Sequence, residues 1–122
     1  MKKIYFSSSC SSSRKTIKFF NEHNISYTAK NIIKDSLTDQ EIKTLLQFAP
    51  NGVNDIIATK AKYIKTHAIN IETLRLPEIY QLIKDEPRIL KRPIIVDFEK
   101  KKIQVGYNED EIEIFLRSNL DD

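Results

Sequence analysis

Two strand-like segments joined by a single helical segment constrain the fold of this chain more than any other feature. Residues 3–6 (KIYF) are a short apolar run of strand-forming residues, and residues 26–30 (SYTAK) have the same character. A serine cluster and one helical segment, closed by residues 22–24 (EHN), lie between them. Strands that are connected through one helix pair in parallel, with a right-handed crossover. The N-terminal region therefore predicts a βαβ unit.

The middle of the chain has helical patterns. Residues 37–49 (LTDQEIKTLLQFA) repeat apolar residues with a helical period, and Thr38 forms a capping box with Glu41. Pro50-Asn51-Gly52 ends this helix, where we expect Gly52 to have a positive φ. Residues 58–69 predict a short helix with a lysine-rich outer face, and another helix begins near Pro77. The predicted apolar stripe of this last helix consists of Leu76, Ile79, Tyr80 and Ile83.

The C-terminal region returns to the period of strands. Apolar runs at 94–96 and 103–105 flank a charged turn, which predicts an antiparallel hairpin. Residues 107–118 (YNEDEIEIFLRS) predict a final helix that Asn108 caps. Its inward-facing residues are expected to be Ile112, Phe115 and Leu116. The whole order predicts an α/β fold with a mixed four-stranded sheet.

Length, charge and cysteine content exclude several classes of protein. The 122 residues suit one domain, residues 1–122, with a core of its own. No apolar run is long enough for a transmembrane helix, and no apolar signal core follows the basic start, so we expect no membrane association and no export. A single cysteine forms no internal disulfide, which suits a cytoplasmic protein. A net charge of +3 is too small for a protein that reads DNA alone.

Cys10, the only cysteine, lies between a predicted strand and a predicted helix. Backbone N–H groups at a helix N-terminus stabilise a thiolate, and we expect Arg14 and Lys15 to add to this effect. The same geometry holds an oxyanion. The alternative is a buried, inert cysteine, because a lone cysteine in an intracellular protein is often structural. The polar, cationic surroundings favour a reactive thiol.

This strand–Cys-x-x-Ser-Arg–helix arrangement, with Arg92-Pro93 opening a late strand, resembles the thioredoxin-like fold of the ArsC family. The resemblance implies a thioredoxin-like core of about residues 1–33 and 91–118, with a helical insertion of about 34–90. It also implies that the peptide bond before Pro93 is cis and faces the thiol loop. The residues of that loop are then Cys10, Ser13, Arg14, Arg92 and Pro93.

Within this family the chain is similar to the Spx regulators over residues 2–117. The resemblance is carried by NGVNDIIATKAK (51–62), LPEIYQLI (76–83), PRILKRPIIVD (87–97) and IQVGYNEDEIEIFL (103–116). It implies a regulator of the transcriptional response to thiol stress, and not an enzyme. Such a regulator binds the C-terminal domain of the RNA polymerase α subunit, blocks the docking of activators and redirects polymerase.

The resemblance also assigns the surface for this partner. Gly52 matches the contact glycine of the family, where the lack of a side chain lets two backbones approach closely. The residues that flank it are Asn51, Val53 and Asn54. Taken without the resemblance, Gly52 is a plain helix stop.

A basic group of residues suggests a second contact of the regulator. Lys60, Lys62 and Lys65 face promoter DNA when polymerase holds the protein there, or else form a solvated helix face. In Spx members a segment after the last helix is recognised by the ClpX–ClpP protease, so the resemblance implies this protease as a further partner. The chain departs from the family there and reads Asn119-Leu120-Asp121-Asp122. We expect no cofactor and no metal.

Two alternatives are enzymes that use Cys10. A glutaredoxin-linked arsenate reductase has the same Cys-x-x-Ser-Arg loop, but of its three further arginines only Arg92 has a counterpart. Lys60 stands at the second position and Gly106-Tyr107-Asn108 at the third, and lysine does not replace the bidentate fork of arginine. The other alternative is a thiol oxidoreductase of the glutaredoxin type. Because Ser13 replaces the second cysteine of Spx, we expect no intramolecular disulfide switch.

Overall fold

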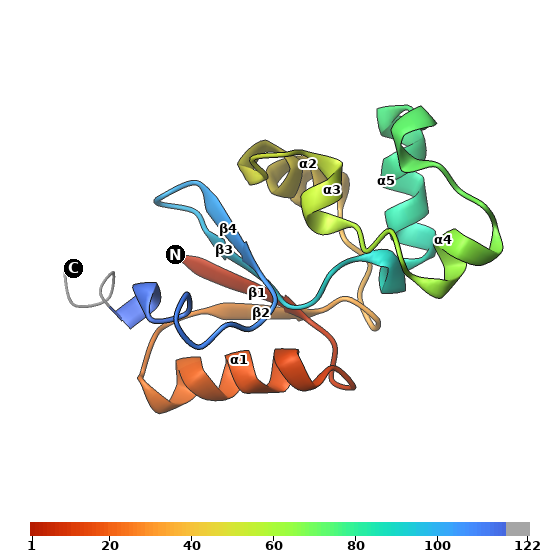
Figure 1. Ribbon diagram of the computed structural model, residues 1–122. Helices are drawn as coiled ribbons and strands as arrows, with labels where there is room; N and C mark the ends of the chain where they lie inside the picture. The colour runs from red at the N-terminus through yellow and green to blue at the C-terminus, as the bar shows by residue number, and fades with distance from the viewer. Residues whose placement is uncertain (117–122) are drawn as a thin grey trace. The chain divides into compact units, whose positions relative to one another are not determined.

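A computed structural model describes residues 1–116 of the chain (Figure 1). The chain forms two compact units: the first comprises Met1–Asn31 and the chain from Arg92 onward, and the second comprises Ile32–Lys91. Every strand of the described part belongs to the first unit, and the second unit is helical. No helix within residues 1–116 is both long enough and apolar enough to cross a membrane.

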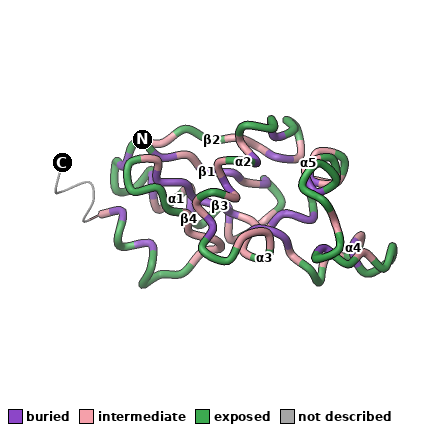
Figure 2. The backbone as a smooth tube through the Cα atoms, turned by 90° about the horizontal axis from the view of Figure 1, so that it is seen from above, coloured by how far each residue is buried: buried purple, intermediate pink, exposed green. Residues whose placement is uncertain are grey.

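The first unit contains the predicted mixed sheet. Its strands are β1 (Lys2–Phe6), β2 (Thr28–Asn31), β3 (Ile94–Asp97) and β4 (Lys102–Val105), in the order β2-β1-β3-β4. The parallel pairing of β1 with β2 confirms the βαβ unit, and the antiparallel pairing of β3 with β4 confirms the hairpin. β3 is buried along its whole length (Figure 2), as expected of a central strand that carries three consecutive apolar residues.

The core of the first unit lies between one face of the sheet, helix α1 (Ser11–Glu22) and the C-terminal segment. Ile4 and Ile95 are direct partners in the β1–β3 register and present their side chains to the same face. This core consists of Ile4, Phe20, Ile25, Ile95, Ile112 and Phe115, all at most 4% exposed. The rings of Phe20 and Phe115 pack with centroids 5.2 Å apart, which joins α1 to the C-terminal segment.

The C-terminal segment differs from the predicted helix over 107–118. The Oδ1 atom of Asn108 accepts hydrogen bonds from the N–H groups of Asp110 and Glu111, as in a cap. Turns follow, however, and helical residues begin only at Ile114. Over residues 114–116 the backbone hydrogen bonds span three residues, as from the N–H of Phe115 to the carbonyl of Ile112, and not the four residues of an α-helix. Residues 117 and 118 of the predicted helix lie outside the described residues.

The second unit consists of short helices: α2 (Asp39–Phe48), α3 (Val53–Ile56), α4 (Lys62–Thr66) and α5 (Leu76–Asp85). Two 3₁₀ turns, η1 (Ile71–Thr73) and η2 (Pro87–Ile89), complete it. The predicted capping box is confirmed, because Thr38 Oγ1 accepts from the Glu41 N–H and Glu41 Oε1 accepts from the Thr38 N–H. Helix α5 has Pro77 in its first turn and buries Ile79 and Ile83.

Two details of the second unit correct the prediction. Helix α4 is shorter than residues 58–69, because Ile57 forms a β-bridge with Leu90 and the Ala58 N–H bonds to the carbonyl of Ile89. Residues held in an extended pairing do not start a helix, and Ala68, with φ of 49°, follows its end. Leu76 is 52% exposed, because it lies at the very start of α5, and does not join the apolar stripe.

Candidate functional site

Cys10 occupies the N-cap position of α1, in the loop that leaves β1. Its backbone is extended, with φ of −88° and ψ of 118°, and its carbonyl accepts the N–H of Arg14 at 3.1 Å. The Cys10 N–H bonds back to the carbonyl of Ser7 at 3.1 Å, which closes the loop. The thiol is half-buried. The fold therefore places Cys10 where the first N–H groups of a helix have no backbone partner of their own.

The environment of Cys10 lowers the pKa of its thiol. Burial raises this pKa, but hydrogen bonds from the Ser13 hydroxyl and from the N–H groups of Ser13 and Ser12, together with the charge of Arg92, lower it by more. The direction of this shift agrees with the preference for the thiolate that the sequence predicted. The predicted cations are wrong: Arg92 supplies the charge, whereas the Arg14 guanidinium donates to the carbonyl of Ser8 at 2.8 Å. Lys15 lies near the ring of Tyr107 instead.

Ser13 is fully buried, three residues after Cys10 in the first turn of α1. Its Oγ accepts the N–H of Ser7 at 3.3 Å, and its hydroxyl bonds to the Cys10 sulfur. The hydroxyl of Ser13 therefore holds the thiolate in place, at the position where the family resemblance puts a second cysteine.

Four further residues shape the loop without having been predicted from the sequence. The Ser7 hydroxyl lies 3.0 Å from that of Ser9, and Asn31 at the end of β2 donates to the Ser8 hydroxyl at 3.1 Å. The sequence does not distinguish these serines from the others in the tract, because their roles depend on hydrogen bonds that form only in the folded loop.

Arg92 and Pro93 complete the thiol loop. The peptide bond between them is cis, as the resemblance implied. The Cys10 S–H donates to the carbonyl of Arg92 with a sulfur–oxygen distance of 3.9 Å, and the Pro93 carbonyl accepts the N–H of Gly106 at 2.8 Å. The structure thus brings together Cys10, Ser13, Arg92 and Pro93, whereas the guanidinium of Arg14 is directed to Ser8.

Gly52 and its neighbours form a loop of the second unit. Gly52 has φ of 70° and ψ of −140°, which confirms the predicted positive φ, and it caps α3. The Asn51 N–H donates to Asp55 Oδ2 at 2.8 Å, and Lys91 Nζ donates to the carbonyl of Asn54 at 3.0 Å. Asn51 and Asn54 are exposed, and Gly52 and Val53 are half-buried. These bonds fix the backbone around Gly52 while leaving it accessible.

The predicted basic residues follow this loop. Lys60, Lys62 and Lys65 are exposed, and Lys62 and Lys65 lie three residues apart on α4, on one face of the helix. Within residues 1–116, no cluster of three or more histidine, cysteine, aspartate or glutamate side chains is arranged to hold a metal ion.

Comparison with known proteins gives two groups of relatives. The model of the ArsC family matches residues 5–115. The global transcriptional regulators Spx 1 of Bacillus cereus and Spx of Staphylococcus aureus are 45% and 43% identical over 113 residues, which cover 93% of this chain and 85% of theirs.

Solved structures show the same fold at lower identity. A putative ArsC family related protein of Bacteroides fragilis has a TM-score of 0.76 at 24% identity, covering 93% of this chain and 96% of its own. An arsenate reductase of Vibrio cholerae has a TM-score of 0.75 at 21% identity, covering 95% of both chains. The chain belongs to the ArsC family, and within it to the family of the Spx transcriptional regulators.

Proposed function

We propose that this protein is a transcriptional regulator that binds the C-terminal domain of the RNA polymerase α subunit through the loop Asn51–Asn54, acts in the cytoplasm and alters which activators reach polymerase during thiol stress. The observation that carries the proposal is the 45% and 43% identity, over 93% of the chain, to global transcriptional regulators. The sequence of the loop matches the contact region that the family resemblance assigns.

The geometry of the Gly52 loop supports a role in binding. A Cβ atom placed on Gly52 would meet no atom within 4 Å, so a side chain there would project into open space. A φ of 70° with a ψ of −140° is also a conformation that favours glycine. The backbone of the loop is therefore bare at its centre, and a partner can approach it closely.

Calorimetric titration with the isolated C-terminal domain of the α subunit tests this function. We expect micromolar or tighter binding by the parent and loss of binding by Gly52→Arg. Gly106→Arg is the matched control, because Gly106 also has a positive φ and open space around it but belongs to the first unit. Absence of binding by the parent would refute the proposal. Equal loss of binding in Gly52→Arg and Gly106→Arg would contradict the assignment of the interface to the Gly52 loop.

Binding of this partner should not depend on oxidation. Cys10 is the only cysteine of the chain, so no internal disulfide exists for a reductant to break. We expect the same affinity with and without dithiothreitol in the titration. A drop in affinity on reduction would show that an oxidised form of Cys10 takes part.

The three lysines are the proposed contact with promoter DNA. Three phosphate contacts give a salt-dependent term that is too small for binding by the free protein. Exchange of Lys60, Lys62 and Lys65 for glutamine should leave the titration with the α domain unchanged and weaken only the complex of protein, polymerase and promoter. Residues 119–122, where the chain departs from the segment that ClpX–ClpP recognises in Spx members, lie outside the described residues.

A second candidate function is thiol chemistry at Cys10, which the lowered pKa of this thiol favours. Arg92 is the one arginine of the chain that matches those of the arsenate reductases, and lysine at position 60 does not supply a bidentate contact. Turnover of arsenate with glutathione and glutaredoxin, or of a small disulfide with glutathione, tests this candidate. Activity that Cys10→Ser abolishes would support an enzyme.

A further inference from the structure

An apolar groove lies in the first unit between the β3–β4 hairpin and the C-terminal segment. Its cavity volume is about 80 Å³, which suits a single aliphatic side chain. We call it the β4 groove, and its lining residues are Asp97, Lys100, Lys102, Ile103, Gln104, Ile114 and Phe115. Ile114 remains 45% exposed at its rim. None of these residues takes part in the thiol loop or in the Gly52 loop.

The strand beside the groove is an edge strand. The sheet order β2-β1-β3-β4 leaves one side of β4 without a neighbouring strand among the described residues. Backbone N–H and C=O groups on such an edge accept a further strand from another chain. The groove therefore combines a place for a side chain with an edge that can bind a backbone.

Gln104 carries an unsatisfied acceptor in this groove. Its Nε2 donates to the carbonyl of Glu111 at 3.0 Å, which fixes the orientation of the amide. Its Oε1 is buried and has no hydrogen-bond partner within the described part of the chain.

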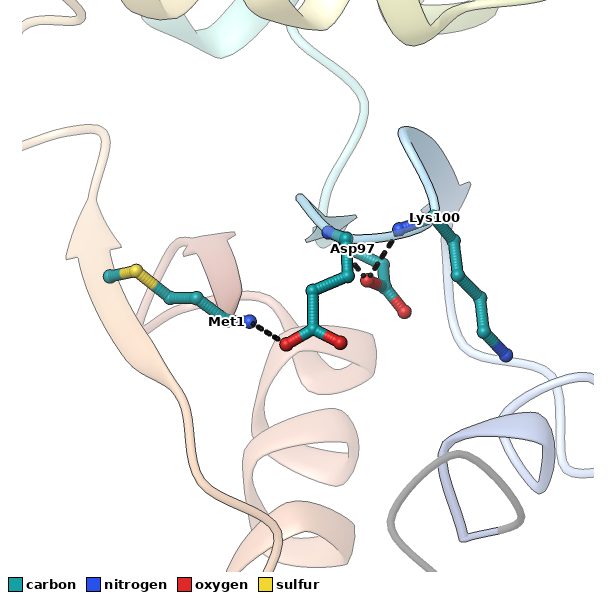
Figure 3. Close-up of polar contacts among 4 residues, drawn as sticks. Met1, Asp97 and Lys100 are labelled. Atoms are coloured by element: carbon teal, nitrogen blue, oxygen red, sulfur yellow. Dashed lines mark hydrogen bonds and ion pairs between the residues drawn. The ribbon is translucent and has the colours of Figure 1, made fainter. Parts of the chain in front are cut away.

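The charged residues that line the groove are Asp97, Lys100 and Lys102. Lys100 and Lys102 line its hairpin end, and the ammonium group of Lys100 points away from Asp97 (Figure 3). The Asp97 carboxylate is itself occupied, because its Oδ1 accepts the N–H groups of Glu99 and Lys100. Glu99 pairs with the N-terminal ammonium of Met1 at 3.0 Å. The acidic residues Glu109, Asp110, Glu111 and Glu113 of the C-terminal segment are exposed and do not line the groove.

We propose that the β4 groove binds an extended segment of a partner protein in which an aliphatic residue is next to acidic residues. The aliphatic side chain fills the cavity over Ile103 and Phe115, and the backbone of the segment pairs with the open side of β4. The carboxylates of the segment lie at the hairpin end of the groove, because the ammonium groups of Lys100 and Lys102 attract them.

Titration of the ¹⁵N-labelled full chain with a short peptide of alternating valine and glutamate, followed by NMR, tests this proposal. We expect shifts confined to the amides of residues 102–105 and 112–116. The double variant Lys100→Glu/Lys102→Glu should weaken binding about tenfold. The matched control Lys60→Glu/Lys62→Glu, with the same charge change in the second unit, should bind like the parent.

Three outcomes would overturn the proposal. The first is equal binding of a peptide of alternating valine and lysine, and the second is a set of shifts outside the groove. The third is shifts of the same amides that grow with protein concentration before any peptide is added, which would make a second copy of the chain the occupant. Because the experiment contains no polymerase, its result is independent of the proposed function.

Discussion

At the scale of single residues, the Ser13 hydroxyl stands where the family resemblance puts the thiol of a second cysteine. Its hydrogen bonds affect the thiol of Cys10. Ser13 is fully buried, and its hydroxyl bonds to the Cys10 sulfur and accepts the N–H of Ser7. A serine in this position is not oxidised, but it stabilises the thiolate of its neighbour. The loop thus keeps a thiol with a lowered pKa and lacks the second cysteine that an internal disulfide needs.

The pH dependence of Cys10 alkylation checks this role. Because the pKa of the thiol is lowered, reaction with iodoacetamide should reach half its maximal rate below the pKa of about 8.5 of a free cysteine. Ser13→Ala removes one hydrogen bond to the thiolate and should shift the midpoint upward, whereas exposed Ser11→Ala should not. An unchanged midpoint in Ser13→Ala would show that the backbone N–H groups and Arg92 suffice.

The same pKa has a consequence for stability. A thiol whose pKa is lower in the folded state than in the unfolded state stabilises the fold above the unfolded pKa. This contribution is lost as the pH falls through the folded pKa. The free energy of unfolding of the parent should therefore rise with pH across this window relative to Cys10→Ser. Parallel curves for the two proteins would contradict the lowered pKa.

At the scale of elements, local signals decide where helices begin when nothing else competes. The capping box of Thr38 and Glu41 starts α2 as the sequence predicted. The predicted start of a helix at Ala58 failed, because the N–H of Ala58 is bonded to the carbonyl of Ile89. A contact between residues far apart in the sequence overrode a helical pattern.

The variant Thr38→Ala tests how much the capping box contributes to the free energy of unfolding. The variant loses the hydroxyl that accepts the Glu41 N–H, and we expect its free energy of unfolding in urea to fall by about 1 kcal/mol. Thr59→Ala, at an exposed loop position, serves as the control and should change the value by less than about 0.5 kcal/mol. Equal losses would mean that the cap adds nothing beyond the removal of a threonine.

At the scale of the whole molecule, segments from both ends of the chain build one core. Ile4 of β1, Phe20 of α1 and Ile112 of the C-terminal segment belong to the same cluster. The first unit therefore forms only when the chain after residue 92 has come back to the chain before residue 31. The helical second unit lies between these segments in sequence.

Two isoleucines in the same segment test this core. Ile112→Ala should lower the free energy of unfolding by about 2–5 kcal/mol, because Ile112 is 1% exposed and its removal leaves a cavity. Ile114→Ala, at a residue 45% exposed, should lower it by less than about 1 kcal/mol. Similar values for the two would show that the segment is not held by Ile112. Urea denaturation followed by circular dichroism gives both numbers.

Much of the fold follows from local patterns. The alternation of strand and helix periods predicted the parallel unit, the hairpin and the mixed sheet, because each depends on residues close in sequence. The positive φ of Gly52 and the capping box are local for the same reason. The family resemblance supplied Pro93 and its cis bond, which composition and spacing alone do not indicate.

The remaining features depend on contacts between distant residues. The sequence by itself determined the order of elements and placed Cys10 at a helix start, since a few neighbouring residues decide both. The family resemblance placed both Arg14 and Arg92 in the thiol loop, but only the tertiary structure decided that the charge of Arg92, and not that of Arg14, lowers the pKa of the thiol, and that Ser13 is buried. It also decided that Gln104 Oε1 is buried without a hydrogen-bond partner within residues 1–116, because this depends on how the C-terminal segment packs against β4.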